Sequence, residues 1–165
     1  MTDGHASADT PGVIAPPPLI ALAALLAGVA ADWLWPLNVL GSALGWPMRI
    51  AISVPLVLGG GVLAVAAERA FKRVGTNVPP WRPALALATS GPYAYIRNPM
   101  YVGLILLLAG IAAVLASDWL VILLVPTVLV LHFGVVLREE RYLEAKFGED
   151  YRRYKASVPR YGWLR

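Results

Sequence analysis

Apolar residues gather in four long runs along the chain, with polar residues between them. The runs cover residues 19–35, 50–67, 100–116 and 119–137. Each run has about 17 to 19 residues, close to the length that crosses the hydrocarbon core of a bilayer as a helix. No run alternates as a barrel strand would, and backbone groups in lipid must be satisfied internally, so helices are expected. The pattern predicts an all-α integral membrane protein with about four transmembrane helices.

The last two runs are separated only by Ser117 and Asp118, which predicts a tight antiparallel hairpin. Pro55 and Pro126 lie inside the second and fourth runs, where each removes a backbone hydrogen bond. Such a proline can open a cavity by bending the helix, or it can simply be tolerated, as in many membrane helices. The glycines at 59–61 lie within an apolar run and predict a close helix contact rather than a phosphate loop.

The pattern changes after Leu137 to a charged segment with one apolar face. The apolar positions recur at helical spacing, at Leu143, Phe147, Tyr151, Tyr154 and Val158. We expect a C-terminal amphipathic helical segment, which Gly148 can break and Pro159 ends. Two interpretations stay open, a helix lying on the membrane surface with basic residues toward lipid phosphates, and a lid over a bound cofactor.

Composition and charge support the membrane assignment and suggest an orientation. The chain is 58% hydrophobic and 15% charged, with a mean hydropathy of +0.64. Residues 68–99 and the tail from residue 138 together hold 13 of the 14 basic residues. Since cytoplasmic segments carry the excess of Lys and Arg, both termini are expected in the cytoplasm, with the helices in a bacterial inner membrane. Residues 1–18, rich in proline and free of Lys and Arg, predict a flexible tail rather than a secretory signal.

Several classes of function are excluded by residue content. The chain has no cysteine, so it has no disulfide framework and no thiol nucleophile. Two isolated histidines, His5 and His132, make no metal site, so no metal is expected. The basic residues are explained by the membrane, so no nucleic-acid partner is expected. The oligomeric state is not indicated by the sequence.

Two polar clusters flank the predicted hairpin on the same side. The first is Arg97-Asn98-Pro99 with Tyr93, Tyr95 and Tyr101, and the second is Arg138-Glu139-Glu140-Arg141. Because the hairpin is antiparallel, its open end brings the clusters together. A solvated glutamate pair at the membrane edge is the plainer interpretation, but the facing Arg and Tyr residues favour a binding site.

These clusters carry a resemblance to a known family. The stretches "GTNVPPWRPALALATSGPYAYIRNPMYVG" and "LREERYLEAKFGEDYRRYKASVPRYGW", in that order, resemble the integral-membrane methyltransferases that include isoprenylcysteine carboxyl methyltransferase and phosphatidylethanolamine N-methyltransferase. The resemblance covers roughly residues 75–163. It implies that residues 68–165 form the methyltransferase core, preceded at 19–67 by two transmembrane helices without a diagnostic motif.

The resemblance implies that S-adenosylmethionine binds at the cytoplasmic mouth of the hairpin, under the C-terminal segment. The positions that match the family's cofactor motifs are Tyr93, Arg97, Asn98, Pro99, Tyr101, Gly103, Glu139 and Glu140. The family usually has His where this chain has Asn98, which removes a titratable group but keeps a hydrogen-bonding side chain. The implied substrate is a lipid-like or hydrophobic small molecule that enters from the membrane lipid.

Roles follow from the charges of the methyl donor. Either glutamate can pair with its ammonium, Arg97 can hold its carboxylate, and Gly103 allows close approach. The candidate catalytic residues are Arg138, Glu139 and Asn98. Arg138 can clamp a carboxylate acceptor or snorkel to lipid phosphates, and Glu139 can take a proton from an amine acceptor.

Three alternatives stay open from the sequence. His132 can border an acceptor tunnel or make an interhelical hydrogen bond. A sterol-type reductase uses a partly similar motif but needs more spans than this chain has. A non-enzymatic membrane scaffold or transporter subunit would use Arg97 and the glutamates as helix anchors.

Overall fold

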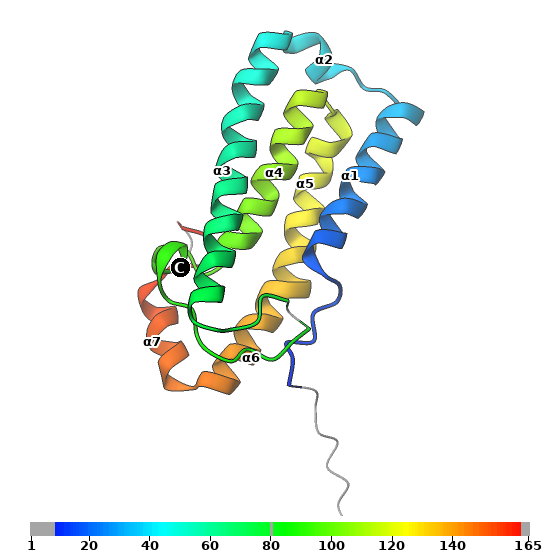
Figure 1. The fold of residues 1–165 in the computed structure, drawn as a ribbon. Coiled ribbons are helices and arrows are strands. Elements are labelled where there is room, and N and C mark those ends of the chain that lie inside the picture. Colours follow the sequence, from blue (N-terminus) through cyan, green and yellow to red (C-terminus); the bar gives the residue numbers. More distant parts are fainter. Residues whose placement is uncertain (1–8, 80, 163–165) are drawn as a thin grey trace, which may run out of the picture.

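The computed structural model describes residues 9–79 and 81–162 (Figure 1). Within these ranges every regular element is helical and no strand occurs, which confirms the all-α prediction. In chain order the elements are α1 (Pro17–Leu34), α2 (Val39–Ala43), α3 (Trp46–Arg73), η1 (Gly91–Ala94), α4 (Pro99–Leu115), α5 (Asp118–Leu131), η2 (His132–Val136), α6 (Leu137–Phe147) and α7 (Glu149–Ser157).

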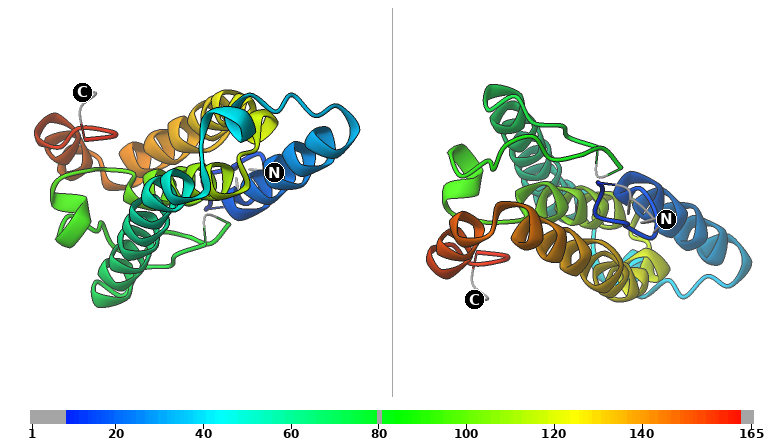
Figure 2. Two further views of the ribbon diagram at one scale, coloured as in Figure 1. Left: turned by 90° about the horizontal axis from the view of Figure 1, so that it is seen from above. Right: turned by 90° about the horizontal axis from the view of Figure 1, so that it is seen from below.

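The bundle has the helices of an integral membrane protein. Three helices are long and apolar enough to cross a bilayer, namely α1, α3 and the continuous helix formed by α5, η2 and α6. Their outward faces expose large apolar side chains such as Leu26, Val62 and Val125, which suits contact with lipid. The fourth apolar helix, α4, has 17 residues and packs within the bundle (Figure 2). Spanning is therefore supported for three helices, and for α4 it stays a prediction.

Small residues bring the helices close together. A Cβ added to Gly60 of α3 would lie 2.7 Å from the carbonyl oxygen of Gly103 in α4, so the two backbones are in direct contact. The neighbouring Gly61 faces open space, since an added Cβ would meet nothing within 4 Å. Gly28 of α1 packs in the same way against Leu120 of α5. The predicted close helix contact is thus confirmed at Gly60.

The turn between α4 and α5 is as tight as the sequence predicts. Ala116 takes the left-handed conformation, and the Ser117 hydroxyl accepts a hydrogen bond from the Leu120 N–H at 3.0 Å, capping α5. The Asp118 carboxylate accepts hydrogen bonds from the first two backbone N–H groups of α2, at 2.8 and 2.9 Å. This end of the bundle is therefore held together by side-chain caps.

The last membrane helix does not end where its apolar run ends. The sequence places the boundary at Leu137, but the helix continues through the π-helical η2 into α6. Helical hydrogen bonding does not depend on side-chain polarity, so the backbone continues as the surface changes from apolar to charged. The carbonyl oxygen of Gly134, within η2, accepts a hydrogen bond from the N–H of Ile14 at 3.2 Å. A π-helical turn leaves such carbonyl groups available for partners outside the helix.

The predicted N-terminal tail is packed where the structure describes it. Residues 1–8 lie outside the described residues, whereas residues 9–16 run along α6. Lys146 Nζ lies 2.6 Å from Asp9 Oδ2, and the Tyr142 hydroxyl donates to Asp9 Oδ1 at 2.8 Å. A flexible tail was expected here because the pattern along residues 9–16 gives no sign of these distant contacts.

The C-terminal segment forms α6 and α7, which meet at Gly148 with a positive φ of 54°. The predicted apolar face is confirmed. Tyr151, Tyr154 and Val158 are buried, and Leu143 and Phe147 pack beside them. These side chains lie against α3 and η1 rather than against lipid, so the face is part of the protein core. Figure 1 shows the segment after α3, α6 and α7 together at one end of the bundle, opposite α2.

Candidate functional site

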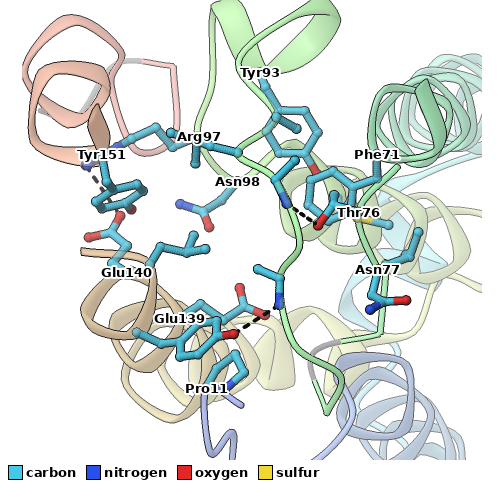
Figure 3. Close-up of a pocket in the computed structure, with 18 of the residues that line it drawn as sticks. Pro11, Phe71, Thr76, Asn77, Tyr93, Arg97, Asn98, Glu139, Glu140 and Tyr151 are labelled. Carbon is cyan, nitrogen blue, oxygen red and sulfur yellow. Dashed lines mark hydrogen bonds and ion pairs between the residues drawn. The ribbon is translucent and has the colours of Figure 1, made fainter. Parts of the chain in front are cut away.

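A pocket opens at the end of the bundle where α4 begins (Figure 3). Its walls come from the start of α4, from α6 and α7, from the segment that joins α3 to α4, and from the N-terminal segment. The empty space is about 830 Å³ when the open solvent at its mouth is included. Six of the predicted site residues line it, namely Tyr93, Arg97, Asn98, Tyr101, Glu139 and Glu140.

The two polar clusters meet in this pocket. Arg97 Nη2 lies 3.4 Å from Glu140 Oε1, and the Tyr101 hydroxyl donates to Glu139 Oε1 at 2.7 Å. The hairpin therefore brings the clusters together as its antiparallel arrangement predicts.

The entry to α4 is fixed by contacts with the C-terminal segment. Asn98 is the N-cap of α4 and is followed by Pro99, whose fixed φ suits the first helical position. The Arg97 N–H donates to the Pro159 carbonyl oxygen at 3.0 Å, and Asn98 Nδ2 donates to the Arg160 carbonyl oxygen at 3.3 Å. At the position of the family's histidine, this asparagine holds the C-terminal segment by its amide.

Arg97 carries hydrogen-bond donors that the described residues do not use. Only 4% of its side chain is exposed, and among the residues described Nε and Nη1 have no hydrogen-bond partner. Buried polar groups are almost always paired, and an unpaired one costs about 1–3 kcal/mol. Two unpartnered guanidinium nitrogens on a residue that lines the pocket suit a ligand with an anionic group.

Glu140 is already engaged on both carboxylate oxygens. Arg160 Nε donates to Oε1 at 2.9 Å, and Arg160 Nη2 donates to Oε2 at 2.7 Å. These hydrogen bonds raise the pKa of Arg160, so the guanidinium stays charged. With two arginines beside it, Glu140 is a poorer partner than Glu139 for the ammonium of a ligand, which favours Glu139 of the two candidates.

Glu139 has one carboxylate oxygen that is available to a ligand. Its Oε1 accepts from Tyr101, and no described residue donates to Oε2. Figure 3 shows its side chain beside the pocket. Glu139 can therefore pair with a ligand cation or take a proton from an acceptor.

Tyrosines form the aromatic wall of the pocket. The Tyr93 ring stacks on Phe71 with centroids 4.9 Å apart, and the Tyr154 hydroxyl donates to the Tyr93 carbonyl oxygen at 2.7 Å. Tyr151 is only 1% exposed. Burial raises the pKa of Tyr93, Tyr151 and Tyr154 well above the ordinary value, so these phenols stay protonated at neutral pH. They can act as hydrogen-bond donors and ring faces, not as bases.

The structure adds wall residues that the sequence did not single out. Thr76 Oγ1 accepts from the Leu85 N–H at 2.9 Å, and the Tyr142 hydroxyl accepts from the Ala84 N–H at 3.0 Å. Asn77 also lines the pocket. Thr76 and Asn77 belong to the "GTN" that opens the first family-like stretch, and this was the available signal for them.

Three predicted site residues do not line the pocket. Pro99 is fully buried at the start of α4. Gly103 faces α3, since a Cβ there would lie 2.8 Å from the Gly60 carbonyl oxygen, so it serves helix packing rather than cofactor approach. Arg138 is exposed, and its Nη1 donates to the Gly12 carbonyl oxygen at 2.9 Å.

His132 makes a hydrogen bond rather than lining the pocket. Its Nδ1 lies 2.8 Å from the Tyr161 hydroxyl, which ties the C-terminal segment to η2. This favours the hydrogen-bonded interpretation of His132, with a partner outside the membrane helices. Across residues 9–79 and 81–162, no three potential metal-ligand side chains gather in one place.

A second, apolar hollow adjoins the pocket. It has about 750 Å³ of empty space and lies between the start of α1, α3 and α4. It shares four lining residues with the first pocket, Val78, Pro79, Met100 and Tyr101. Trp81 and Leu104 are among its other lining residues. The two hollows are therefore neighbours that share part of their walls.

Comparison with known proteins places the chain among methyltransferases. The family model described as phospholipid methyltransferase matches residues 48–150. The Schizosaccharomyces pombe protein named Protein-S-isoprenylcysteine O-methyltransferase is 38% identical over 74 residues, which are 44% of this chain but only 31% of that protein. An uncharacterized protein of Haemophilus influenzae is 42% identical over 67 residues, 39% of this chain and the whole of that protein. No solved structure matches.

Proposed function

The chain belongs to the phospholipid methyltransferase family, and we propose that it transfers a methyl group from S-adenosylmethionine to an acceptor with an apolar tail. The observation that carries the proposal is the buried Arg97, with two unpartnered guanidinium nitrogens in a pocket lined by both family-like motifs. Membership of the family supports membrane methyl transfer, and the donor and the acceptor are the more specific parts of the proposal.

The charges of the pocket fit the methyl donor. S-adenosylmethionine carries a carboxylate, an ammonium and a sulfonium. An unpartnered nitrogen of Arg97, Nε or Nη1, would donate to the carboxylate, since charge-assisted bonds to guanidinium are strong. Glu139 would pair with the ammonium or face the acceptor, and the rings of Tyr93 and Tyr151 offer faces that attract a cation. When bound, the donor supplies an already activated methyl group.

The protein's own task is then to align and desolvate the acceptor. The apolar hollow beside Met100 and Tyr101 would hold an apolar tail, with the reactive group in the polar pocket. Glu139 would accept a proton from that group. Arg138, the residue expected to clamp a carboxylate, points elsewhere, and a carboxylate would meet Glu139 with like charge. These features favour an amine over a carboxylate as the acceptor.

We include the sequence-based orientation in the proposal. The basic segments lie at the pocket end of the bundle, which would face the cytoplasm of a bacterial cell, where the donor is made.

The test is a calorimetric titration of the detergent-solubilised protein with S-adenosylhomocysteine. Wild type is expected to bind, and Arg97→Gln to bind at least about tenfold more weakly, since a hydrogen bond to a charged group contributes about 1.5–3 kcal/mol. Arg153→Gln, an exposed arginine of α7, is the matched control and should bind as wild type does. Absence of binding by wild type would refute the proposed donor.

The acceptor class is tested with methyl-labelled donor. Phosphatidylethanolamine in vesicles supplies an amine, and an N-acetylated farnesylcysteine supplies a carboxylate. Label in the amine lipid is expected, and label only in the farnesylcysteine would reverse the preference for an amine.

A further inference from the structure

Three consecutive residues near the C-terminus hold the pocket from one side. The Pro159 carbonyl oxygen accepts the Arg97 N–H, and the Arg160 carbonyl oxygen accepts Asn98 Nδ2. The Tyr161 hydroxyl meets His132, as described above. The side chain of Arg160 reaches inward to Glu140. Arg160 lies outside residues 48–150, the stretch that matches the family.

Arg160 and Arg97 share one buried carboxylate unequally. Arg160 takes both oxygens of Glu140 at 2.9 and 2.7 Å, the side-by-side geometry of a strong guanidinium–carboxylate pair. Arg97 has one contact with the same carboxylate, at 3.4 Å. Glu140 is only 5% exposed, so water does little to screen either contact.

This unequal sharing leaves Arg97 available to a ligand. If Arg160 were absent, Glu140 would have Arg97 as its remaining charged partner, and a two-bond pair between them would use the N–H groups that are now free. The charge balance acts in the same direction. The group formed by Arg97, Arg160 and Glu140 carries one net positive charge, and removal of Arg160 would make this group neutral.

We propose that Arg160 is a positioning residue, which occupies Glu140 so that an unpartnered nitrogen of Arg97, Nε or Nη1, is free to donate to the carboxylate of the methyl donor. The inference rests on the proposed function. It extends the site to a residue beyond the stretch that the family model matches and gives that residue a role in recognising one chemical group of the ligand.

The test combines a change in the protein with a change in the ligand. The affinities of S-adenosylhomocysteine and of its decarboxylated analogue, which lacks only the carboxylate, are measured for wild type, Arg160→Gln and Arg160→Lys. In wild type S-adenosylhomocysteine should bind more tightly than the analogue. Arg160→Gln should weaken S-adenosylhomocysteine about tenfold or more and leave the analogue nearly unchanged, so the ratio of affinities falls. Arg160→Lys keeps the charge but not the two-bond geometry and should recover part of the ratio.

Controls separate positioning from support of the fold. Tyr161→Phe removes the bond to His132 from the same segment and should leave the ratio at the wild-type value. A purely structural Arg160 would weaken both ligands equally in Arg160→Gln, and this result would overturn the inference. If Arg160→Gln changed the affinity of neither ligand, the inference would be overturned as well. Failure of wild type to bind S-adenosylhomocysteine at all would instead refute the proposed function.

Discussion

The guanidinium of Arg97 lies 3.4 Å from the carboxylate of Glu140, with both side chains buried. Arg97 precedes α4 and Glu140 lies in α6, so the contact joins the two ends of a helical hairpin. A buried charge requires a partner. Both oxygens of Glu140 accept hydrogen bonds from Arg160, so Glu140 is not paired with Arg97 alone. The free donors of Arg97 are what remains for a ligand.

The contact between α3 and α4 predicts a strong effect of one added methyl group. Gly60→Ala would place a Cβ 2.7 Å from the Gly103 carbonyl oxygen, so the helices must separate. We expect a loss of about 1–3 kcal/mol of stability, measured by thermal unfolding in detergent. Gly61→Ala, next to it on the open face, is the matched control and should be as stable as wild type or slightly more so. Equal stability of the two variants would contradict the close contact.

The cap between the hairpin and α2 predicts a local effect far from the pocket. Asp118→Ala removes both acceptors for the first N–H groups of α2, and we expect a loss of about 1 kcal/mol in thermal unfolding. Asp118→Asn keeps one acceptor and should lose less. Binding of S-adenosylhomocysteine should not change in either variant, because the cap lies at the opposite end of the bundle from the pocket (Figure 1). Normal stability together with impaired binding of S-adenosylhomocysteine would contradict this prediction.

Glu139→Gln separates methyl transfer from donor binding. The amide keeps an acceptor for the Tyr101 hydroxyl but cannot take a proton. The rate of labelled methyl transfer to an amine lipid should fall about 10²- to 10⁴-fold. S-adenosylhomocysteine affinity should change much less, and Glu144→Gln, on the outer side of α6, should behave as wild type. An undiminished rate in Glu139→Gln would remove this residue from proton transfer.

The N-terminal segment should be released in acid. Hydrogen bonds from Lys146 and then Tyr142 lower the pKa of Asp9 below its ordinary value of 3.8. A lowered pKa means that the contact adds stability above the ordinary value and is lost as the pH falls through the lowered one. The chain has no cysteine, so Thr10→Cys gives a unique site for a spin label. The label should stay immobile at pH 3.8 and become mobile only in stronger acid, since the pKa of Asp9 lies below that value. In Lys146→Met it should be mobile at neutral pH too, and a label that stays immobile there would contradict the contact.

The sequence was sufficient for the helices and for the convergence of the two clusters, because hydrophobic runs and a two-residue turn determine both. Motif matching also assigned Gly103 and Arg138 to the site, although neither lines the pocket, because it takes no account of which helix face a residue lies on. Tyr101 and Gly103 are two positions apart, and such residues do not share a helix face. Tyr101 meets Glu139, so Gly103 turns to α3. Arg138 and Glu140 are also two positions apart. Glu140 is buried and lines the pocket, whereas Arg138 is exposed.

Other features depend on contacts that leave no local pattern. Arg160 reaches Glu140 from an irregular stretch after α7, so no periodicity indicates which way it points. The packing of Ile14 on Gly134 depends on the π-helical turn, which apolar periodicity does not predict. Tertiary packing determines these features, and they become visible only in the folded chain.

The place of the methyl donor is the central claim, and ultraviolet cross-linking of methyl-labelled S-adenosylmethionine tests it most directly. After irradiation the protein is cleaved and the labelled peptides are identified, with excess S-adenosylhomocysteine as competitor. The account predicts competed label in the peptides that hold Tyr93 to Tyr101 and Glu139 to Tyr154, which line the pocket. Competed label confined to α1 or to the outer half of α3 would contradict it.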